Sequence, residues 1–278
     1  MAAVTVDALI EPVTPLDFGG SRRRVRWGRG VILLVAGAYF LVPLYAALHF
    51  SFQDNNGHFS FAPVQAISTQ PGLASAFWLS VRLATVTTVI TMVLMVPTVI
   101  YVHLRLRRLR RVIEVISTLP IVIPPIVLIL GVLHAAPLWL KSSPYLLSLV
   151  YVVLAMPFVY RSLDAGLSAL DLKTLVEAAR SLGAGTLMTL WRVLVPNLRS
   201  ALLSATVLTV ALVLGEFTMA SLDLWETLPV WMVNFDQTNA HVSTAVAMLS
   251  LIVTWLLLTL IVSLERSPRR REVKGEFE

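Results

Sequence analysis

The chain has 278 residues, a formal net charge of +6, no cysteine, and a composition that is 57% hydrophobic and only 14% charged. So many apolar residues with so few charges are typical of an integral membrane protein and exclude an ordinary soluble domain. The lack of cysteine excludes disulfides, zinc–thiolate sites, iron–sulfur clusters and thiol catalysis. The sequence contains no G-x-x-x-x-G-K-S/T phosphate-binding loop, so we predict that the chain has no ATPase site of its own.

The N-terminal segment, residues 1–29, contains no long apolar run and ends in five arginines, which predicts a cytoplasmic tail rather than a signal peptide. The apolar stretch from Gly30 to Phe50 then supplies the roughly 20 residues that a helix needs to cross a bilayer. Residues 51–73 contain no Lys or Arg, which is typical of a loop on the outer side of the membrane.

Further apolar stretches are long enough to cross the membrane: about Ala74 to His103, Val112 to His134, Tyr145 to Arg161, Leu198 to Leu222 and Ser243 to Leu264. The third of the six predicted spans contains Pro120, Pro124 and Pro125. A proline lacks the backbone N–H and clashes with the preceding turn, so we expect this helix to be kinked or broken. Its freed carbonyls must find partners inside the bundle.

The basic residues support this topology. Of the 22 Lys and Arg, twenty lie in four segments that the topology places in the cytoplasm or at the span ends that border them, five at each, whereas Lys141 lies in an outer loop and Arg82 within a span. By the positive-inside rule, this distribution predicts six transmembrane helices with both termini in the cytoplasm. The predicted parts are a cytoplasmic tail (1–29), a transmembrane domain (30–265) with a cytoplasmic loop at 162–197, and a second cytoplasmic tail (266–278). Topology thus explains the positive charge, and no nucleic acid is expected as a partner.

The loop between the fourth and fifth spans has the pattern of two short helices. Asp171 predicts an N-cap for a helix from Leu172 to Leu182, because its side chain can accept hydrogen bonds from free backbone N–H groups. Gly183 follows where a left-handed residue is favoured by the absence of a Cβ.

The second short helix begins close to this glycine. Thr186 predicts its N-cap, and Pro196 is expected to end it. Asn197 then predicts the N-cap of the fifth span.

The same loop contains a spaced motif. Glu177-Ala178-Ala179 is followed after three residues by Gly183 and after nine more by Val193-Leu194-Val195-Pro196. This spacing resembles the E-A-A-x3-G-x9-I-x-L-P loop of ABC importer permeases, with valines in place of the usual Ile and Leu. In that family the loop is the cytoplasmic coupling helix that docks on the ATP-hydrolysing subunit. The resemblance implies this role for Glu177, Ala178, Ala179, Gly183 and Pro196, and an ordinary helix-turn-helix linker is the alternative interpretation.

Three further stretches resemble one branch of these permeases. The residues Leu119 to Leu128 resemble the third-span signature of polyamine, ferric-iron, phosphonate and sulfate permeases. Leu214-Gly215-Glu216-Phe217 and Thr227-Leu228-Pro229-Val230-Trp231 resemble the same branch, nearest to the C-type permease of spermidine/putrescine importers. The resemblance covers about Ala74 to Leu264.

What the resemblance implies is an all-α integral membrane protein with the type I ABC importer permease fold, in the cell membrane. Two permeases, as a homodimer or with a sister subunit, would assemble with two ATPase subunits and an extracytoplasmic substrate-binding protein. ATP and Mg²⁺ would bind to the ATPase subunits, and the permease itself would hold no cofactor and hydrolyse nothing. The expected solute is small and polar, of the polyamine, ferric-iron or phosphonate type.

Ionisable residues within spans are candidates for function, since charge in hydrocarbon is costly. The carboxylate of Glu216 either meets a cationic solute in a cavity or holds the bundle together as a structural or gating group. We favour the second interpretation, because a similar G-E-F occurs in permeases for anions. For Arg82, pairing or snorkelling is favoured over a place in the translocation path. We expect Glu114 to pair with the neighbouring arginines 105–111.

Other residues are less distinctive. Pro124 and Pro125 are candidates for the path or gate because they interrupt a span. Trp225, Trp231 and Phe235 are expected to anchor in the membrane interface. The histidines show no spacing typical of metal ligands.

Two functions outside this family remain open at the level of the sequence. A stand-alone secondary transporter could use Glu216 and Arg82 as an ion or proton relay, but it would have no need of the E-A-A spacing. A membrane scaffold would leave the buried acid and the broken third span without a purpose.

Overall fold

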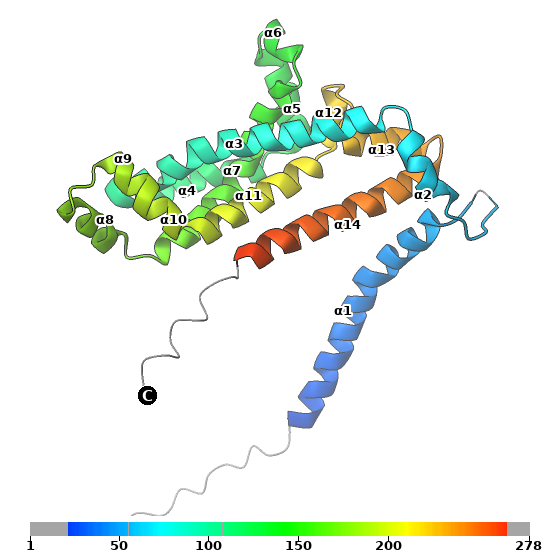
Figure 1. Cartoon of the computed structure of the whole chain (residues 1–278), viewed down its shortest axis with the longest axis horizontal. Helices are drawn as coiled ribbons and strands as arrows, with labels where there is room; N and C mark the ends of the chain where they lie inside the picture. Colours follow the sequence, from blue (N-terminus) through cyan, green and yellow to red (C-terminus); the bar gives the residue numbers. More distant parts are fainter. Residues whose placement is uncertain (1–21, 55, 107, 266–278) are drawn as a thin grey trace, which may run out of the picture. The chain divides into compact units, whose positions relative to one another are not determined.

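The computed structural model describes residues 22–54, 56–106 and 108–265, which form helices joined by short loops and no strand (Figure 1). One isolated β-bridge joins Gln53 and Phe59. The chain divides into two units, Met1–His49 and Phe50–Glu278.

The described part of the first unit is a single helix, most of α1 (Arg22–Ser51). Gly28–Ser51 is apolar enough to cross a membrane, and its 24 residues extend about 36 Å at 1.5 Å per residue, more than the roughly 30 Å hydrocarbon layer. Its large apolar side chains, such as Leu33, Leu34 and Tyr39, are exposed. The described residues of this unit form no second layer to bury them against, and exposed apolar side chains of this kind suit a hydrocarbon environment.

The second unit is organised around three helices that pack against one another, α3 (Leu73–Arg105), α7 (Tyr145–Ser168) and α11 (Arg199–Leu214). The other elements are α2 (Ala62–Ala66), η2 (Ile67–Thr69), α4 (Arg110–Thr118), η3 (Leu119–Ile121), α5 (Pro125–Ala135), α6 (Leu138–Lys141), α8 (Leu172–Ser181), α9 (Thr186–Thr189), η4 (Leu190–Leu194), α10 (Val195–Asn197), α12 (Thr218–Leu222), α13 (Leu228–Asp236) and α14 (Ala240–Glu265).

Two apolar clusters hold the three central helices together at opposite ends. One joins the C-terminal half of α3 to α7, α11 and the loop after α7, and its fully buried members include Val99, Tyr160 and Leu198. The other joins the N-terminal half of α3 to α5, α7 and α12, and includes Leu83 and Met219. The loop between the fourth and fifth spans is therefore packed into the same core as the helices it connects.

The third predicted span is broken, as its prolines predict. The segment Arg110–Ile121 and the helix Pro125–Ala135 meet at 95°. Pro124 is the residue before α5 and Pro125 is its first residue, where a missing N–H costs nothing. The chain therefore changes direction at these prolines.

The fifth predicted span, Leu198 to Leu222, is wrong as a single helix. Helix α11 ends at Leu214, and residues 215–217 separate it from α12. The Glu216 carboxylate accepts hydrogen bonds from the backbone N–H groups of Met219 at 2.8 Å and Ala220 at 3.3 Å. These are N–H groups of the first turn of α12, so a side chain within the span starts a new helix and thereby ends the old one.

The helices that are long enough to cross a membrane agree in part with the six spans predicted from the sequence. In the described residues, Gly28–Ser51, Leu73–Arg105 and Tyr145–Ser168 are long and apolar enough to cross a membrane. Counting each of two bent helix pairs as one span raises the number to five, and Ala240–Leu256 is a shorter apolar helix. The count of six spans, the position of both termini and the boundaries of the tails therefore stay predictions.

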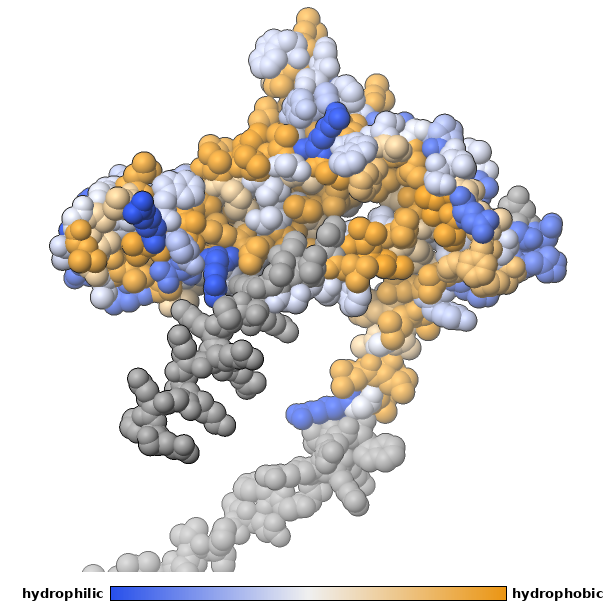
Figure 2. Space-filling view, in the orientation of Figure 1, coloured by the Kyte–Doolittle hydropathy of each residue, from blue (hydrophilic) through white to orange (hydrophobic). Residues whose placement is uncertain are grey.

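The surface of the second unit agrees with a lipid environment. Large apolar side chains are exposed on several helices, among them Val93 on α3, Val127 on α5 and Trp255 on α14. Figure 2 shows apolar residues across much of the visible face of this unit. A soluble protein rarely exposes so extensive an apolar surface, whereas a helix in hydrocarbon gains by it.

Candidate functional site

The loop after α7 begins with the two features that its sequence predicts. Asp171 accepts a hydrogen bond from the Thr174 backbone N–H at 3.3 Å and another from the Thr174 hydroxyl at 2.6 Å. The hydroxyl and then the backbone bond lower the pKa of the Asp171 carboxyl. At the other end of α8, Gly183 has φ of 82°. Both the N-cap and the left-handed residue are confirmed.

Helix α8 has one face toward the core and one toward the outside. Leu172 is buried in the apolar cluster around α3 and α7, and Ala179 is buried as well. Glu177 and Ala178 are exposed on the other face, and the Glu177 carboxylate lies 3.9 Å from the Lys173 ammonium on the same helix. Of the predicted E-A-A residues, Glu177 and Ala178 thus face outward, whereas Ala179 lies on the buried face of the helix.

The predictions for the second half of the loop were partly wrong. Thr186 is the first residue of α9 rather than its cap, because the extended Gly185 precedes it and has its carbonyl bonded to the Thr189 hydroxyl at 3.0 Å. Pro196 does not end the helix, which continues through η4 and α10 to Asn197.

Helix η4 explains how the proline is accommodated. It is a π-helical turn, Leu190–Leu194, just before Pro196. A proline cannot donate to the carbonyl four residues earlier, and the wider π turn relieves the clash with that carbonyl. Asn197 does not cap α11, because its side-chain amide donates backward to the Val193 carbonyl at 2.7 Å.

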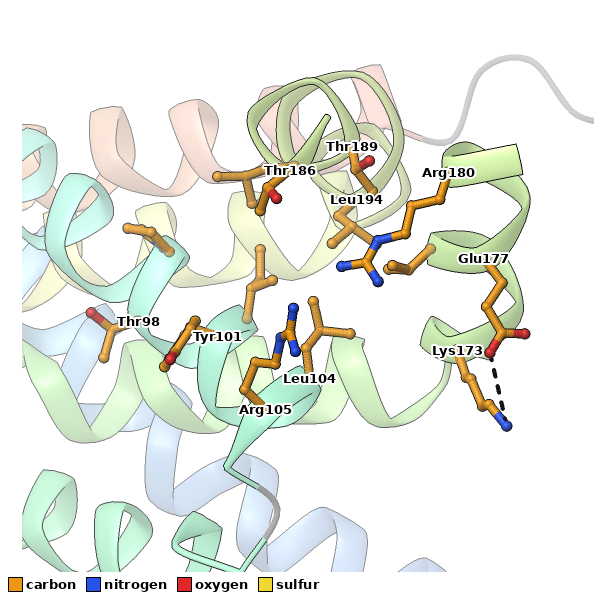
Figure 3. A pocket seen from close by; sticks show the side chains of 14 residues that line it. Thr98, Tyr101, Leu104, Arg105, Lys173, Glu177, Arg180, Thr186, Thr189 and Leu194 are labelled. Atoms are coloured by element: carbon orange, nitrogen blue, oxygen red, sulfur yellow. Dashed lines mark ion pairs between the residues drawn. The ribbon is translucent and has the colours of Figure 1, made fainter. Parts of the chain in front are cut away.

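The loop and the end of α3 enclose a groove of about 1110 Å³. Figure 3 shows Arg105 of α3 and Arg180 of α8 extending toward the same space. The lining residues are Pro97, Thr98, Ile100, Tyr101, Leu104, Arg105, Lys173, Val176, Glu177, Arg180, Thr186, Thr189, Leu190 and Leu194. Sequence reasoning missed this groove, since its two walls are about 70 residues apart in the chain.

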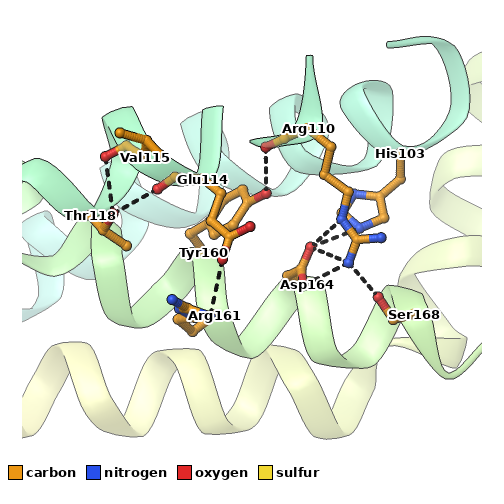
Figure 4. A network of polar contacts seen from close by, with 9 residues as sticks. All are labelled: His103, Arg110, Glu114, Val115, Thr118, Tyr160, Arg161, Asp164 and Ser168. Atoms are coloured by element: carbon orange, nitrogen blue, oxygen red, sulfur yellow. Dashed lines mark hydrogen bonds and ion pairs between the residues drawn. The ribbon is translucent and has the colours of Figure 1, made fainter. Parts of the chain in front are cut away.

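A network of polar side chains beside this end of the bundle was also missed (Figure 4). The Arg110 guanidinium donates to both oxygens of Asp164, at 2.9 and 2.8 Å, and to the Ser168 hydroxyl at 2.8 Å. This two-pronged geometry is the strong form of the arginine–carboxylate pair. It ties the start of α4 to α7.

His103 at the end of α3 contacts the same carboxylate. Its Nε2 lies 3.0 Å from Asp164 Oδ1, and its Nδ1 lies 2.9 Å from the Val99 carbonyl. Both neighbours are acceptors, and the Nε2 contact has ion-pair distance without hydrogen-bond alignment. One carboxylate on α7 therefore joins α3 and α4.

Glu114 has a different partner from the one expected. Its carboxylate lies 3.1 Å from the Arg161 guanidinium on α7 and forms no ion pair with the described arginines 105, 108, 110 and 111. Helix α4 packs against α7, so Glu114 reaches the basic residue on that helix.

The Glu216 carboxylate lies in the break between α11 and α12. Besides the two backbone donors of α12, it accepts a hydrogen bond from the Tyr151 hydroxyl at 2.9 Å. Tyr151 is buried in the cluster of α7. The side chain thus has three donors, and this geometry suits a structural or gating group more than an unpartnered acid in a cavity.

The remaining candidates lie apart from these groups. Arg82 is exposed on α3, in a shallow pocket with Trp78 and Tyr145, and has no ion pair among the described residues. Pro124 and Pro125 are exposed at the break of the third span.

Trp231 is not an interface anchor. Its side chain is 3% exposed, stacks on Phe235 at 4.6 Å between ring centroids, and donates from Nε1 to the Pro71 carbonyl at 3.1 Å. It belongs to the core because α13 folds back against α3. Trp225 packs against the apolar cluster that contains Met219, so its main contacts are also within the protein.

Comparisons with known proteins agree with this architecture. Residues 72–270 match the family described as binding-protein-dependent transport system inner membrane component. The sulfate transport system permease protein CysW of Synechococcus elongatus is 37% identical over 75 residues, which are 27% of this chain and 26% of that protein. The matched segment therefore spans about a quarter of that relative.

A solved structure gives the same fold over most of the chain. It is the crystal structure of a bacterial ABC transporter involved in the import of the acidic polysaccharide alginate. The TM-score is 0.66 at 17% sequence identity, and the match covers 92% of this chain and 100% of that one. The predicted all-helical importer-permease fold is thereby confirmed.

Proposed function

This chain belongs to the family of inner membrane components of binding-protein-dependent transport systems, and from this premise we propose that it forms part of a solute path driven by a separate ATPase. Its place in the family makes it the multi-pass membrane component of an ABC importer, which is not itself catalytic. The proposal adds that residues 171–196 receive the motion of the ATPase and that the helices around Glu216 open and close the path.

The observation that carries the coupling role is the two-sided packing of α8 and the turn after it. Leu172 joins the helix to the core cluster, against which Leu175 and Val176 also pack, while Leu182 is 89% exposed and Leu187 70% exposed just beyond the E-A-A residues. Exposed apolar residues on a polar loop outside the spans are favourable for a protein contact. A partner that pushes on this surface would move α7 and α11 together, because the buried face is continuous with them.

The local geometry favours a stiff element. The capped start of α8 and the left-handed Gly183 fix a corner between two short helices. The π-helical turn continues the second helix through Pro196 to within two residues of α11. We infer that Glu177, Ala178, Ala179, Gly183 and Pro196 act together as the coupling element.

For the path, we infer that Glu216 is a gate residue that keeps the break of the fifth span in shape. Arg82, Pro124 and Pro125 are proposed to face the path or a second permease, because they are exposed and a membrane helix has little reason to expose a guanidinium to hydrocarbon. The second permease, as an identical copy or a sister subunit, would complete the path.

The solute is proposed to be an anion. The relatives import sulfate and alginate by their names, and both oxygens of the Glu216 carboxylate are already bonded to donors within the protein rather than directed to a solute. A phosphonate fits this class, whereas a polyamine or ferric iron does not. The motif resemblance to spermidine/putrescine permeases is thus interpreted as shared architecture rather than a shared solute.

A secondary transporter with a relay between Glu216 and Arg82 is the weaker proposal. The three donors to Glu216 come from Tyr151 and from backbone, none of them from Arg82. A proton relay needs a chain of groups that exchange protons, and backbone N–H groups do not.

The test is uptake into proteoliposomes with the permease, its ATPase and the loaded binding protein. We expect uptake to require ATP and the binding protein, and to persist when a protonophore abolishes the proton gradient. Uptake without ATP that the protonophore stops would favour the secondary transporter. Identification of the ligand that copurifies with the binding protein tests whether the solute is an anion.

A further inference from the structure

The groove between the end of α3 and the loop has an excess of positive charge. Its ionisable lining residues are Arg105, Lys173, Glu177 and Arg180. Glu177 pairs with Lys173 at 3.9 Å, and Figure 3 shows both on the side of α8 away from the two guanidinium groups. Arg105 and Arg180 have no ion pair with any carboxylate among the described residues.

Two cations that extend into one space repel each other, and this repulsion falls when an anion lies between them. Planar guanidinium groups recognise the oxygens of phosphate with paired hydrogen bonds. Hydroxyl groups of Tyr101 and Thr186 line the same groove and can add donors, whereas the Thr98 hydroxyl donates to the Leu94 carbonyl at 2.6 Å. The polar part of the groove is therefore suited to a phosphate-type oxyanion.

The rest of the lining is apolar. Ile100, Leu104 and Leu190 continue the wall beside the arginines, and the π-helical turn lies along this wall. A ligand with a charged phosphate and an attached hydrocarbon chain would contact both parts. Free phosphate would leave the apolar wall exposed to water.

The depth of the groove in the membrane agrees with a lipid. Helix α3 has 33 residues and ends at Arg105, which makes it about 50 Å long at 1.5 Å per residue. The hydrocarbon layer is only about 30 Å thick, and about 45 Å with the headgroups. The end of α3 therefore reaches the headgroup layer, where anionic lipids attract basic side chains.

We propose that this groove binds the phosphate of an anionic phospholipid headgroup between Arg105 and Arg180, with the start of an acyl chain against Ile100, Leu104 and Leu190. The lipid would fill the space between α3 and α8 and so hold the loop to the bundle. The inference requires only that α3 crosses the bilayer, and it is independent of the solute and of the ATPase.

The experiment measures lipid retained by the full-length chain after extraction from vesicles of phosphatidylcholine and phosphatidylglycerol, by native mass spectrometry. Wild type should retain phosphatidylglycerol over phosphatidylcholine. Removing each arginine should reduce this preference by about fivefold, as expected for one interfacial charge, so Arg105→Gln with Arg180→Gln should abolish it. The matched control, Arg192→Gln with Arg199→Gln, removes the same charge from exposed positions that do not line the groove and should retain the lipid.

Two further measurements are needed. The first distinguishes a lipid phosphate from free phosphate, and the second shows whether the lost lipid preference comes from lost charge or from misfolding. Excess inorganic phosphate should not displace phosphatidylglycerol, and displacement would show a soluble oxyanion site instead of a lipid site. Arg105→Lys with Arg180→Lys should keep part of the preference while the glutamine pair loses it, and both must elute as the wild-type species in gel filtration. Equal retention of the two lipids by wild type, or equal loss in the groove and control pairs, would overturn the proposal.

Discussion

The Tyr151 hydroxyl on α7 donates a hydrogen bond of 2.9 Å to the Glu216 carboxylate in the break between α11 and α12. A buried aromatic residue of one span thus holds the acid that starts a new helix within another. We therefore expect a substitution of Glu216 to act mainly by altering the packing of the helices, and less by removing a charge from the solute path.

Substitutions at this contact should form a graded series. Glu216→Ala loses all three hydrogen bonds, Glu216→Gln keeps an acceptor but loses the charge, and Tyr151→Phe removes one donor. A bond to a charged group contributes about 1.5–3 kcal/mol, so uptake and thermal stability should fall most in Glu216→Ala and least in Tyr151→Phe. Competition between sulfate and spermidine for uptake is the measurement of solute preference, which should not change. A switch of preference in Glu216→Gln would mean that the carboxylate meets the solute.

Gly183→Val should leave the permease in the membrane but abolish ATP-driven uptake. With φ at 82°, a residue that has a Cβ is strained by roughly 1–2 kcal/mol, and the corner between α8 and α9 must change. The control is Gly185→Ala on the same loop, where φ is −70° and nothing lies within 4 Å of an added Cβ. Uptake, ATPase copurification and hydrolysis stimulated by the loaded binding protein are the measurements. Normal uptake in Gly183→Val would remove the coupling role from this corner.

Gly166→Ala should destabilise the contact between α7 and α11. An added Cβ would lie 2.5 Å from Ala201 Cβ and 3.3 Å from Leu198 Cδ2, so the helices must separate. Overpacking of this kind costs about 1–3 kcal/mol. The matched control, Gly131→Ala in α5, adds a methyl group with nothing within 4 Å and should be neutral or slightly stabilising. Melting temperatures in detergent compare the two, and equal shifts would argue against close packing at Gly166.

Asp223 should make the folded protein less stable as the pH rises, which is the opposite of the usual effect of a carboxyl group. Burial raises the pKa of its carboxyl to about 6 from an ordinary value of 3.8, and its Oδ2 has no hydrogen-bond partner among the described residues. Between about pH 4 and 6 the folded protein keeps a proton that the unfolded chain has lost, so this carboxyl destabilises the fold as the pH rises through that window. Asp223→Asn should therefore gain melting temperature over wild type above pH 6 and lose that advantage near pH 4. A difference that stays constant with pH would contradict the burial of this carboxyl.

Topology can be read from single cysteines, because the chain has none of its own. By the distribution of basic residues, cysteines in place of Asn56 or Asn234 should react with a membrane-impermeant maleimide on intact cells. A cysteine in place of Ser181 should react only after the cells are opened. Labelling of the Ser181 position from outside would reverse the topology.

Much of this fold follows from short-range sequence features. The proline break of the third span, the cap at Asp171 and the left-handed Gly183 depend on residues within a few positions of one another. Features that join distant segments were not predictable from the sequence alone. Asp164 meets Arg110 and His103 across 54 and 61 positions, and nothing in the local pattern marks it.

The wrong caps have a related cause. Thr186 and Asn197 have side chains suited to capping, but Thr186 follows the extended Gly185 that precedes α9, and Asn197 ends the helix that contains the π-helical turn before Pro196. Such a turn depends on how the segment packs between α8 and α11, and the helix propensities of single residues carry no information about that packing. A structural or gating role for Glu216 stays a prediction, and its three donors could be identified only from the structure.

The continuous helix that contains the π-helical turn also fixes the number of residues that the loop can have. A residue inserted into or deleted from the helix that runs from Thr186 to Asn197 rotates everything before it by about 100° relative to α11. Residues Glu177 and Ala178 would then point in a different direction, although every side chain of the loop was kept. Insertions and deletions between Gly183 and Pro196 should therefore be far less tolerated than substitutions there, and homologous chains should preserve this interval while their sequences diverge.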